Sequence, residues 1–182
     1  MNEMKKTPYI WLISGCSSGF GREIALQALS EGDFVGVSSR NVKDVEDICK
    51  EYPKTALPIK LDVTNKDEIK RSIQTINKVF GGLDILVNNA GYGYLAAIEE
   101  GEDEEVRKLF ETNFFGALEL TKAALPGMRA QRFGRIINNS SQAGIMANPG
   151  TGYYSASKYA LEGLMEALDK ELRPLNISVT SV

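Results

Sequence analysis

The segment Ser14-Gly-Cys-Ser-Ser-Gly-Phe-Gly21 decides the fold, because it joins an apolar run, Tyr9 to Ile13, to an amphipathic stretch. A glycine-rich turn between a strand and a helix is the context of a dinucleotide-binding loop. Gly15 permits a tight turn, Gly19 lets the backbone approach a pyrophosphate, and Gly21 allows close packing of helix and strand. The N–H groups at the helix start also attract phosphate. The segment therefore predicts a cofactor-binding strand-loop-helix unit.

The spacing of this loop is G-x-x-x-G-x-G, which differs from G-x-G-x-x-G. The loop also lacks the Lys-Ser/Thr ending of an ATP-binding loop, which argues against phosphoryl transfer. Ser17, Ser18 and Phe20 complete the candidate cofactor-binding loop with its glycines. Ser14, Ser17 and Ser18 can equally be small turn fillers, and so can Cys16.

Short apolar runs alternate with amphipathic stretches along the whole chain, without a linker. The runs are rich in Ile, Val and Leu, as buried parallel strands are. Strands are predicted over 9–13, 34–38, 56–60, 83–88, 135–139 and 177–182, and helices over 19–30, 42–50, 66–79, 102–129 and 153–172. This order predicts one α/β domain over residues 1–182, a doubly wound parallel sheet with helices on both faces.

The longest predicted helix, residues 102–129, opens with four acidic residues, which favour the positive end of a helix dipole. This acidic cluster is best interpreted as a solvated helix start, and no metal site is expected. Pro126 and Gly127 should bend or fray the last turn, since proline removes a backbone donor. The chain stops at Val182, inside its sixth apolar run. Natural domains seldom end in this way, so a truncated C-terminal region is expected.

The composition excludes several classes of protein. The 182 residues include 21 Lys and Arg against 24 Asp and Glu, a net charge of −3, and no basic run tracks nucleic acid. Histidine is absent, which excludes Ser-His-Asp hydrolases and His-ligated zinc. Two isolated cysteines support neither a disulfide framework nor a zinc site. With no signal peptide or membrane span expected, the cytoplasm is the simplest location.

The second predicted strand ends at Ser39 and Arg40, about where a dinucleotide site meets the adenosine ribose. An acidic residue there would bind the free ribose hydroxyls of NAD and repel a 2'-phosphate. An uncharged Ser39 followed by a cationic Arg40 instead favours NADP, with NAD still possible. Alternatively, Arg40 is only a surface residue.

Tyr154 and Lys158 lie four residues apart at the start of a predicted helix, so both side chains share one face. A free phenol titrates near ~10, but a neighbouring ammonium favours the phenolate. Tyr154 could then exchange a proton with a substrate oxygen. Ser140 and Ser141 follow the fifth predicted strand, where the active-site loops of parallel sheets gather.

Taken together, these elements resemble the short-chain dehydrogenases/reductases, a family with a Rossmann-like fold. The matching elements occur in the family's order over nearly the whole chain, namely Ser14–Gly21, Asp62-Val63, Asn88–Gly91, Asn113, Ser141 and Tyr154–Lys158. The sequence departs at Ser14, where the family often has Thr. It also lacks the Pro-Gly segment expected after the sixth strand, the seventh strand and the helices that cover the substrate.

The resemblance implies four catalytic residues. Tyr154 would be the general acid/base, and Lys158 would lower its pKa and hold the nicotinamide ribose. Ser141 would bond the substrate oxygen, and Asn113 would anchor a water leading to Lys158.

The resemblance also implies further cofactor-binding residues. Asp62 and Val63 would contact the adenine, while Asn89, Ala90 and Gly91 would steady the sheet beside the cofactor.

The expected function is NADP(H)-dependent interconversion of a secondary alcohol and a carbonyl compound. Tyr92, Tyr94 and Leu95 follow Gly91 and could line a pocket for a lipophilic substrate, although packing or surface roles suit them equally. A dinucleotide-binding regulatory protein without turnover is the alternative. A sugar-nucleotide epimerase or dehydratase fits less well, because its glycine spacing differs and its chain is longer. The long apolar helices, which pair across a two-fold axis in the family, imply a homodimer or homotetramer.

Overall fold

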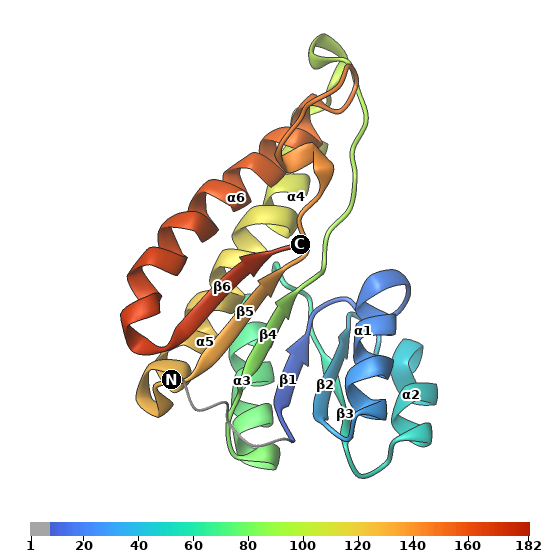
Figure 1. Cartoon of the computed structure of the whole chain (residues 1–182). Coiled ribbons are helices and arrows are strands. Elements are labelled where there is room, and N and C mark those ends of the chain that lie inside the picture. Colours follow the sequence, from blue (N-terminus) through green and yellow to red (C-terminus); the bar gives the residue numbers. More distant parts are fainter. Residues whose placement is uncertain (1–7) are drawn as a thin grey trace.

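The computed structural model of this protein describes residues 8–182, and a six-stranded parallel sheet forms its centre (Figure 1). The strand order is β3-β2-β1-β4-β5-β6. The strands are β1 (Ile10–Ile13), β2 (Phe34–Ser39), β3 (Ala56–Lys60), β4 (Ile85–Asn88), β5 (Gly134–Asn138) and β6 (Ile177–Ser181). Each predicted strand is therefore present, with its ends shifted by at most two residues.

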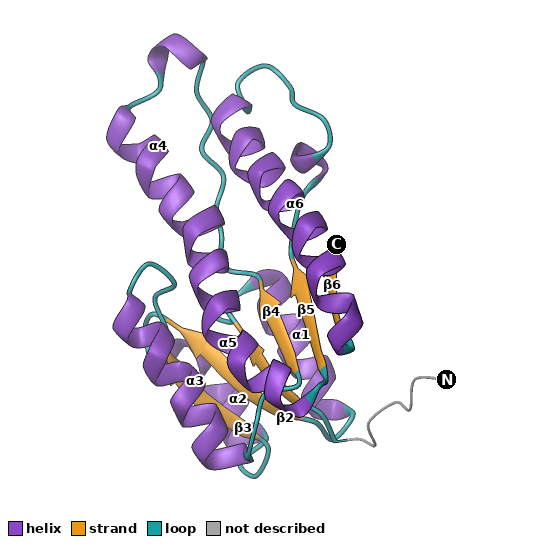
Figure 2. Cartoon of the chain, turned by 90° about the vertical axis from the view of Figure 1, so that its left-hand side faces the viewer, coloured by secondary structure: helices purple, strands orange, loops and turns teal. Residues whose placement is uncertain are grey.

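Helices cover both faces of this sheet (Figures 1 and 2). They are α1 (Gly19–Ser30), α2 (Glu46–Glu51), α3 (Lys66–Phe80), α4 (Asp103–Phe110), α5 (Ala117–Gln131) and α6 (Gly152–Leu172). No helix in the described part of the chain is long and apolar enough to cross a membrane. The doubly wound α/β architecture expected from the sequence is confirmed.

Successive side chains of the central strands point to opposite faces of the sheet, and a hydrophobic core lies on each face. Leu12 of β1 packs into the core formed with α3, α5 and the end of α6. The next residue, Ile13, packs into the core formed with α1 and α2. Because its side chains alternate between the two faces, β1, which lies between these two cores, is apolar at every position.

Two predicted helices are not continuous α-helices. The segment predicted over 42–50 begins as a 3-10 turn, η1 (Val42–Val45), before α2. The segment predicted over 102–129 is divided by a π-helical turn, η3 (Glu111–Gly116), between α4 and α5. Pro126 does not end α5, which continues to Gln131 and stops where Arg132 adopts a left-handed conformation.

The chain reverses its direction of strand addition between β1 and β4. After β3 it crosses the sheet, and β4 pairs with β1 on the side opposite β2. Such a reversal opens a crevice beyond the carboxyl ends of the strands, where ligands bind in open α/β sheets. The loops that follow β1 and β4 carry the glycine loop and residues 89–91.

Candidate active site

The glycine loop lies beyond the end of β1, and two of its glycines adopt backbone conformations that favour glycine. Gly15 and Gly19 have φ values of 74° and 60°, a region that L side chains rarely adopt. A Cβ at Gly21 would collide with the carbonyl oxygen of Gly15 and the side-chain amide of Asn89. All three predicted glycine positions thus have a steric requirement for glycine.

Residues after β4 hold this loop in place through hydrogen bonds. The Ser14 hydroxyl accepts the N–H groups of Asn89 at 2.9 Å and Ala90 at 3.0 Å, and donates to the Val87 carbonyl. The side-chain amide of Asn89 donates to the carbonyls of Ser14 at 2.9 Å and Gly15 at 3.0 Å. Ser14 is therefore a structural link between β1 and β4 rather than a turn filler.

The outer side of the loop is open to a ligand. Ser17, Ser18 and Phe20 are exposed, with Phe20 at 75%, and nothing lies within 4 Å of a Cβ built on Gly19. The first N–H groups of a helix lack intrahelical partners, and those of α1 lie at this opening. A pyrophosphate fits this environment.

Cys16 points away from the opening, into the core. Its thiol donates to the Ile13 carbonyl, and burial raises the pKa of the thiol to about 12. Cys16 therefore fills space, as one sequence interpretation expected.

The ends of β2 and β3 lie on one side of the glycine loop. The Ser38 carbonyl accepts the N–H of Cys16 at 2.7 Å, which joins β2 to the loop. Ser39 is buried and its hydroxyl bonds the Asn41 carbonyl, whereas Arg40 is exposed. The guanidinium of Arg40 is therefore in solvent, at the position expected for the adenosine ribose.

Asp62 and Val63 follow β3 beside this position. One Asp62 carboxylate oxygen accepts the N–H of Thr64 at 2.9 Å and its hydroxyl at 2.7 Å. Val63 is buried beneath the π-helical turn, where a Cβ on Gly116 would lie 2.7 Å from a Val63 methyl group. One of the two predicted adenine contacts, Val63, is thus packed directly on the segment that carries Asn113.

The π-helical turn presents Asn113 to the crevice. Its side-chain amide donates to the Tyr92 carbonyl at 2.9 Å and to the Ser157 hydroxyl at 3.2 Å, and its oxygen accepts the Tyr92 N–H at 3.0 Å. Asn113 thereby joins the loop after β4 to α6. π-turns interrupt regular helical hydrogen bonding and are frequent at functional sites.

Tyr154 and Lys158 lie one turn apart on α6, next to Asn113. The Lys158 ammonium is 5.8 Å from the centre of the Tyr154 ring and donates to the Asn139 carbonyl at 2.8 Å. A Cβ on Gly91 would lie 3.1 Å from the Asn113 oxygen and 3.8 Å from the Lys158 nitrogen. The predicted lysine, tyrosine and asparagine are therefore close together, as expected.

Lys158 is only 5% exposed, and burial lowers its pKa from its ordinary value. The carboxylate of Glu162, one turn further along α6, partly offsets this effect. A buried cation therefore lies beside the Tyr154 ring.

Ser141 lies at the start of a 3-10 turn, η4 (Gln142–Gly144), which packs on α6. Its hydroxyl oxygen accepts the Ala143 N–H at 3.1 Å, so its proton remains available to a ligand. A Cβ on Gly144 would lie 3.4 Å from the Lys158 Cβ and 3.2 Å from the Glu162 side chain. Gly144, which sequence reasoning missed, thus lets the Ser141 turn approach α6.

All the predicted site residues lie beyond the carboxyl edge of the sheet, where they form two groups. The glycine loop with residues 39–40, 62–63 and 89–91 lies around the ends of β1, β2, β3 and β4. Asn113, Ser141, Tyr154 and Lys158 lie around the ends of β4 and β5. Asn139, whose carbonyl accepts from Lys158, was not predicted as a site residue. The signal that could have indicated it is its place in the polar run 138–141 at the end of β5.

Comparisons with known proteins agree with this arrangement. A family model described as short chain dehydrogenase matches residues 9–182. A 3-ketodihydrosphingosine reductase from Bacteroides thetaiotaomicron is 43% identical over 175 residues, 96% of this chain and 62% of that protein. An NADPH-dependent 3-dehydrocapnine reductase from Ornithobacterium rhinotracheale is 34% identical over 177 residues, 94% of this chain and 62% of that protein.

A crystal structure of a short-chain dehydrogenase from Streptomyces avermitilis matches with a TM-score of 0.94 and 40% identity, over 97% of this chain and 65% of that chain. The chain spans about three-fifths of the length of the two curated relatives described. On the family match over residues 9–182, the chain belongs to the short-chain dehydrogenase/reductase family.

Proposed function

We propose that this protein is an NADP(H)-dependent oxidoreductase that interconverts a secondary alcohol and a carbonyl compound. The observation that carries the proposal is the position of Tyr154, Lys158 and Asn113 beside a loop whose geometry suits a pyrophosphate. The family membership of the chain supports the same reaction class. The regulatory alternative without turnover has no comparable support, because a binding protein needs no proton donor beside a buried lysine.

Each candidate side chain has a distinct task in this proposal. The nicotinamide supplies or accepts the hydride when bound. The Tyr154 phenol donates a proton to the carbonyl oxygen during reduction, and the Lys158 ammonium stabilises the phenolate that remains. The free hydroxyl proton of Ser141 bonds the same substrate oxygen. Asn113 holds the loop after β4 against α6, so that the two sides of the crevice keep their separation.

NADP(H) is proposed over NAD(H) because of the end of β2. Arg40 is exposed there and Ser39 carries no charge, so a 2'-phosphate meets a cation and no carboxylate. A relative that is 34% identical is named as NADPH-dependent, which supports the same choice.

A lipophilic substrate is proposed from two loops beyond the candidate catalytic residues. The N–H of Ala96 donates to the Gly150 carbonyl at 3.0 Å, which ties the loop after β4 to the loop after η4. These loops carry the exposed apolar side chains Leu95, Ile98, Ile145 and Met146. One relative's name, 3-ketodihydrosphingosine reductase, makes a long-chain 3-keto compound the first substrate to try.

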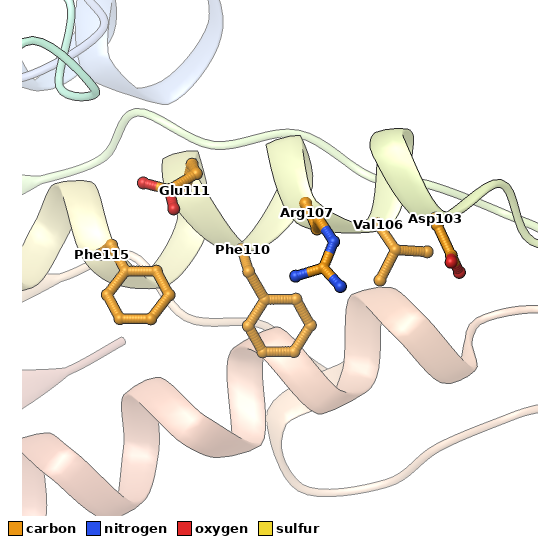
Figure 3. Close-up of a pocket in the computed structure, with 6 residues that line it drawn as sticks. All are labelled: Asp103, Val106, Arg107, Phe110, Glu111 and Phe115. Carbon is orange, nitrogen blue, oxygen red and sulfur yellow. The ribbon is translucent and has the colours of Figure 1, made fainter.

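A homodimer or homotetramer is proposed from the outer side of α4 and α6. Figure 3 shows Phe110 pointing from α4 toward α6, in a hollow of about 330 Å³ that Val106, Arg107 and Phe115 also line. Phe115 is 44% exposed and Tyr159 of α6 is 45% exposed. Aromatic residues of this kind are enriched at the cores of protein interfaces. Light scattering that finds a monomer at micromolar concentration would contradict this assembly.

The cytoplasm is proposed as the location, because both Cys16 and Cys49 are free thiols, as a reducing compartment maintains them.

The test of function is the oxidation of NADPH, followed by its absorbance, with a panel of long-chain and short-chain ketones. We expect turnover with at least one ketone and weaker turnover with NADH. Tight NADPH binding without turnover on any ketone would favour the regulatory alternative, whereas no binding of either cofactor would overturn the proposal.

A further inference from the structure

The glycine loop favours one orientation of the side-chain amide of Asn89. Its nitrogen faces two backbone carbonyls, those of Ser14 and Gly15, at 2.9 Å and 3.0 Å. A carbonyl oxygen only accepts hydrogen bonds, so the nitrogen must be on this side. The amide oxygen of Asn89 must then face the other way, where it needs a donor.

Asn139 supplies that donor. Its side-chain nitrogen donates to the Asn89 oxygen at 2.9 Å. The backbone of Asn139 is itself held on both sides, since its N–H donates to the Asn88 carbonyl at 2.9 Å and its carbonyl accepts from Lys158 at 2.8 Å. The donor is therefore fixed relative to both β4 and α6.

A continuous series of hydrogen bonds thus runs from Lys158 through Asn139 and Asn89 to the glycine loop. We propose that Asn139 is a positioning residue for the cofactor, which acts by fixing the amide orientation of Asn89 and thereby the carbonyls of the glycine loop. The inference rests on the proposed function in one respect, namely that the glycine loop binds NADP(H).

Two substitutions of Asn139 distinguish a role as a hydrogen-bond donor from a role in filling space. Asn139→Asp keeps the shape but places an acceptor against the Asn89 oxygen. Asn89 must then either tolerate two facing oxygens or rotate and turn its oxygen toward the Ser14 and Gly15 carbonyls. Asn139→Ala removes the donor but adds no repulsion. A role through polarity therefore makes Asp the more harmful change, and a role through volume makes Ala the more harmful one.

The experiment measures the NADPH dissociation constant of the full chain by fluorescence titration. We expect Asn139→Ala to weaken binding about threefold to tenfold and Asn139→Asp to weaken it by more than tenfold, because partly buried polar groups lose a partner or face a repulsion. Asn148→Asp is the matched control, because Asn148 is exposed and only its backbone makes hydrogen bonds, to Thr151. The control should bind NADPH as the wild type does.

A double-mutant cycle tests whether Asn139 acts through Asn89. Adding Asn139→Ala to Asn89→Ala should weaken binding no further than Asn89→Ala alone. Additive losses, or Asn139→Asp binding as tightly as the wild type while Asn139→Ala binds weakly, would overturn the inference.

Thermal unfolding without cofactor separates this inference from the proposed function. The melting temperature should fall further for Asn139→Asp than for Asn139→Ala, because the facing oxygens exist in the free protein. If the wild type does not bind NADPH, the proposed function fails, while the order of the two melting temperatures still decides the amide orientation.

Discussion

Replacement of Gly116 by alanine should show how tightly the π-helical turn is packed on the end of β3. Gly116 has helical dihedral angles, with φ −61° and ψ −47°, so alanine causes no backbone strain. The added Cβ would lie 2.7 Å from one Val63 methyl carbon and 3.0 Å from the Val63 carbonyl oxygen. An ordinary contact begins near 3.4 Å, so the turn and Val63 must separate by about 3.4 − 2.7 = 0.7 Å. Such overpacking costs about 1–3 kcal/mol.

Gly163→Ala is the matched control for this substitution. Gly163 lies in α6 with nothing within 4 Å of the added Cβ, so it shows the gain in helix propensity alone, about 1 kcal/mol. At about 2–4 °C per kcal/mol, we expect Gly116→Ala to melt about 2–12 °C below Gly163→Ala.

Scanning calorimetry of the two variants measures this difference, and an NADPH titration should show weaker binding only for Gly116→Ala. Equal melting temperatures for the two variants would refute the packing of the turn on Val63.

Tyr154→Phe should lower carbonyl reduction about 10²–10⁴-fold and leave NADPH binding nearly intact, whereas Tyr153→Phe, the control on the same helix, loses only a bond to the Ile98 carbonyl. Steady-state kinetics of the two variants decide this, and retained turnover in Tyr154→Phe would contradict the role of the phenol. Arg40→Asp should shift the ratio of the NADP and NAD dissociation constants toward NAD, and an unchanged ratio makes Arg40 a surface residue. Lys158→Met should abolish turnover yet raise the melting temperature at neutral pH, because burial lowers the pKa of Lys158 and its ammonium therefore destabilises the fold. This gain should shrink as the pH rises toward 10.5, where the unfolded lysine also loses its proton, and a lower melting temperature for Lys158→Met would contradict it.

The order of strands and helices could be predicted from the sequence because each strand is a short, largely apolar run, and the central strands β1 and β4 are apolar on both faces. Leu12 and Ile13 enter different cores, and this is why β1 is continuously apolar rather than alternating. The π-helical turn could not be predicted in the same way. The apolar spacing of residues 102–129 fits a regular helix, and the wider turn depends on tertiary bonds of Asn113 with Tyr92 and Ser157.

Only part of the candidate site could be predicted from the sequence. Local sequence patterns indicated the glycine loop and the pair Tyr154 and Lys158. The residues of each pattern lie within eight positions of one another in the sequence. The bond between Asn139 and Asn89 joins residues that are 50 positions apart. Gly144 likewise matters only because the turn after Ser141 approaches α6, a contact that no local pattern predicts.

The burial of Cys16 has a consequence for the reactivity of the glycine loop toward oxidants and alkylating agents. Only the thiolate is a good nucleophile, and a thiol with a pKa of about 12 is almost entirely protonated at neutral pH. The sulfur is also fully buried, so peroxides and electrophiles have neither access to it nor a nucleophile to react with. Cys16 can therefore lie within the glycine loop without making that loop sensitive to oxidation.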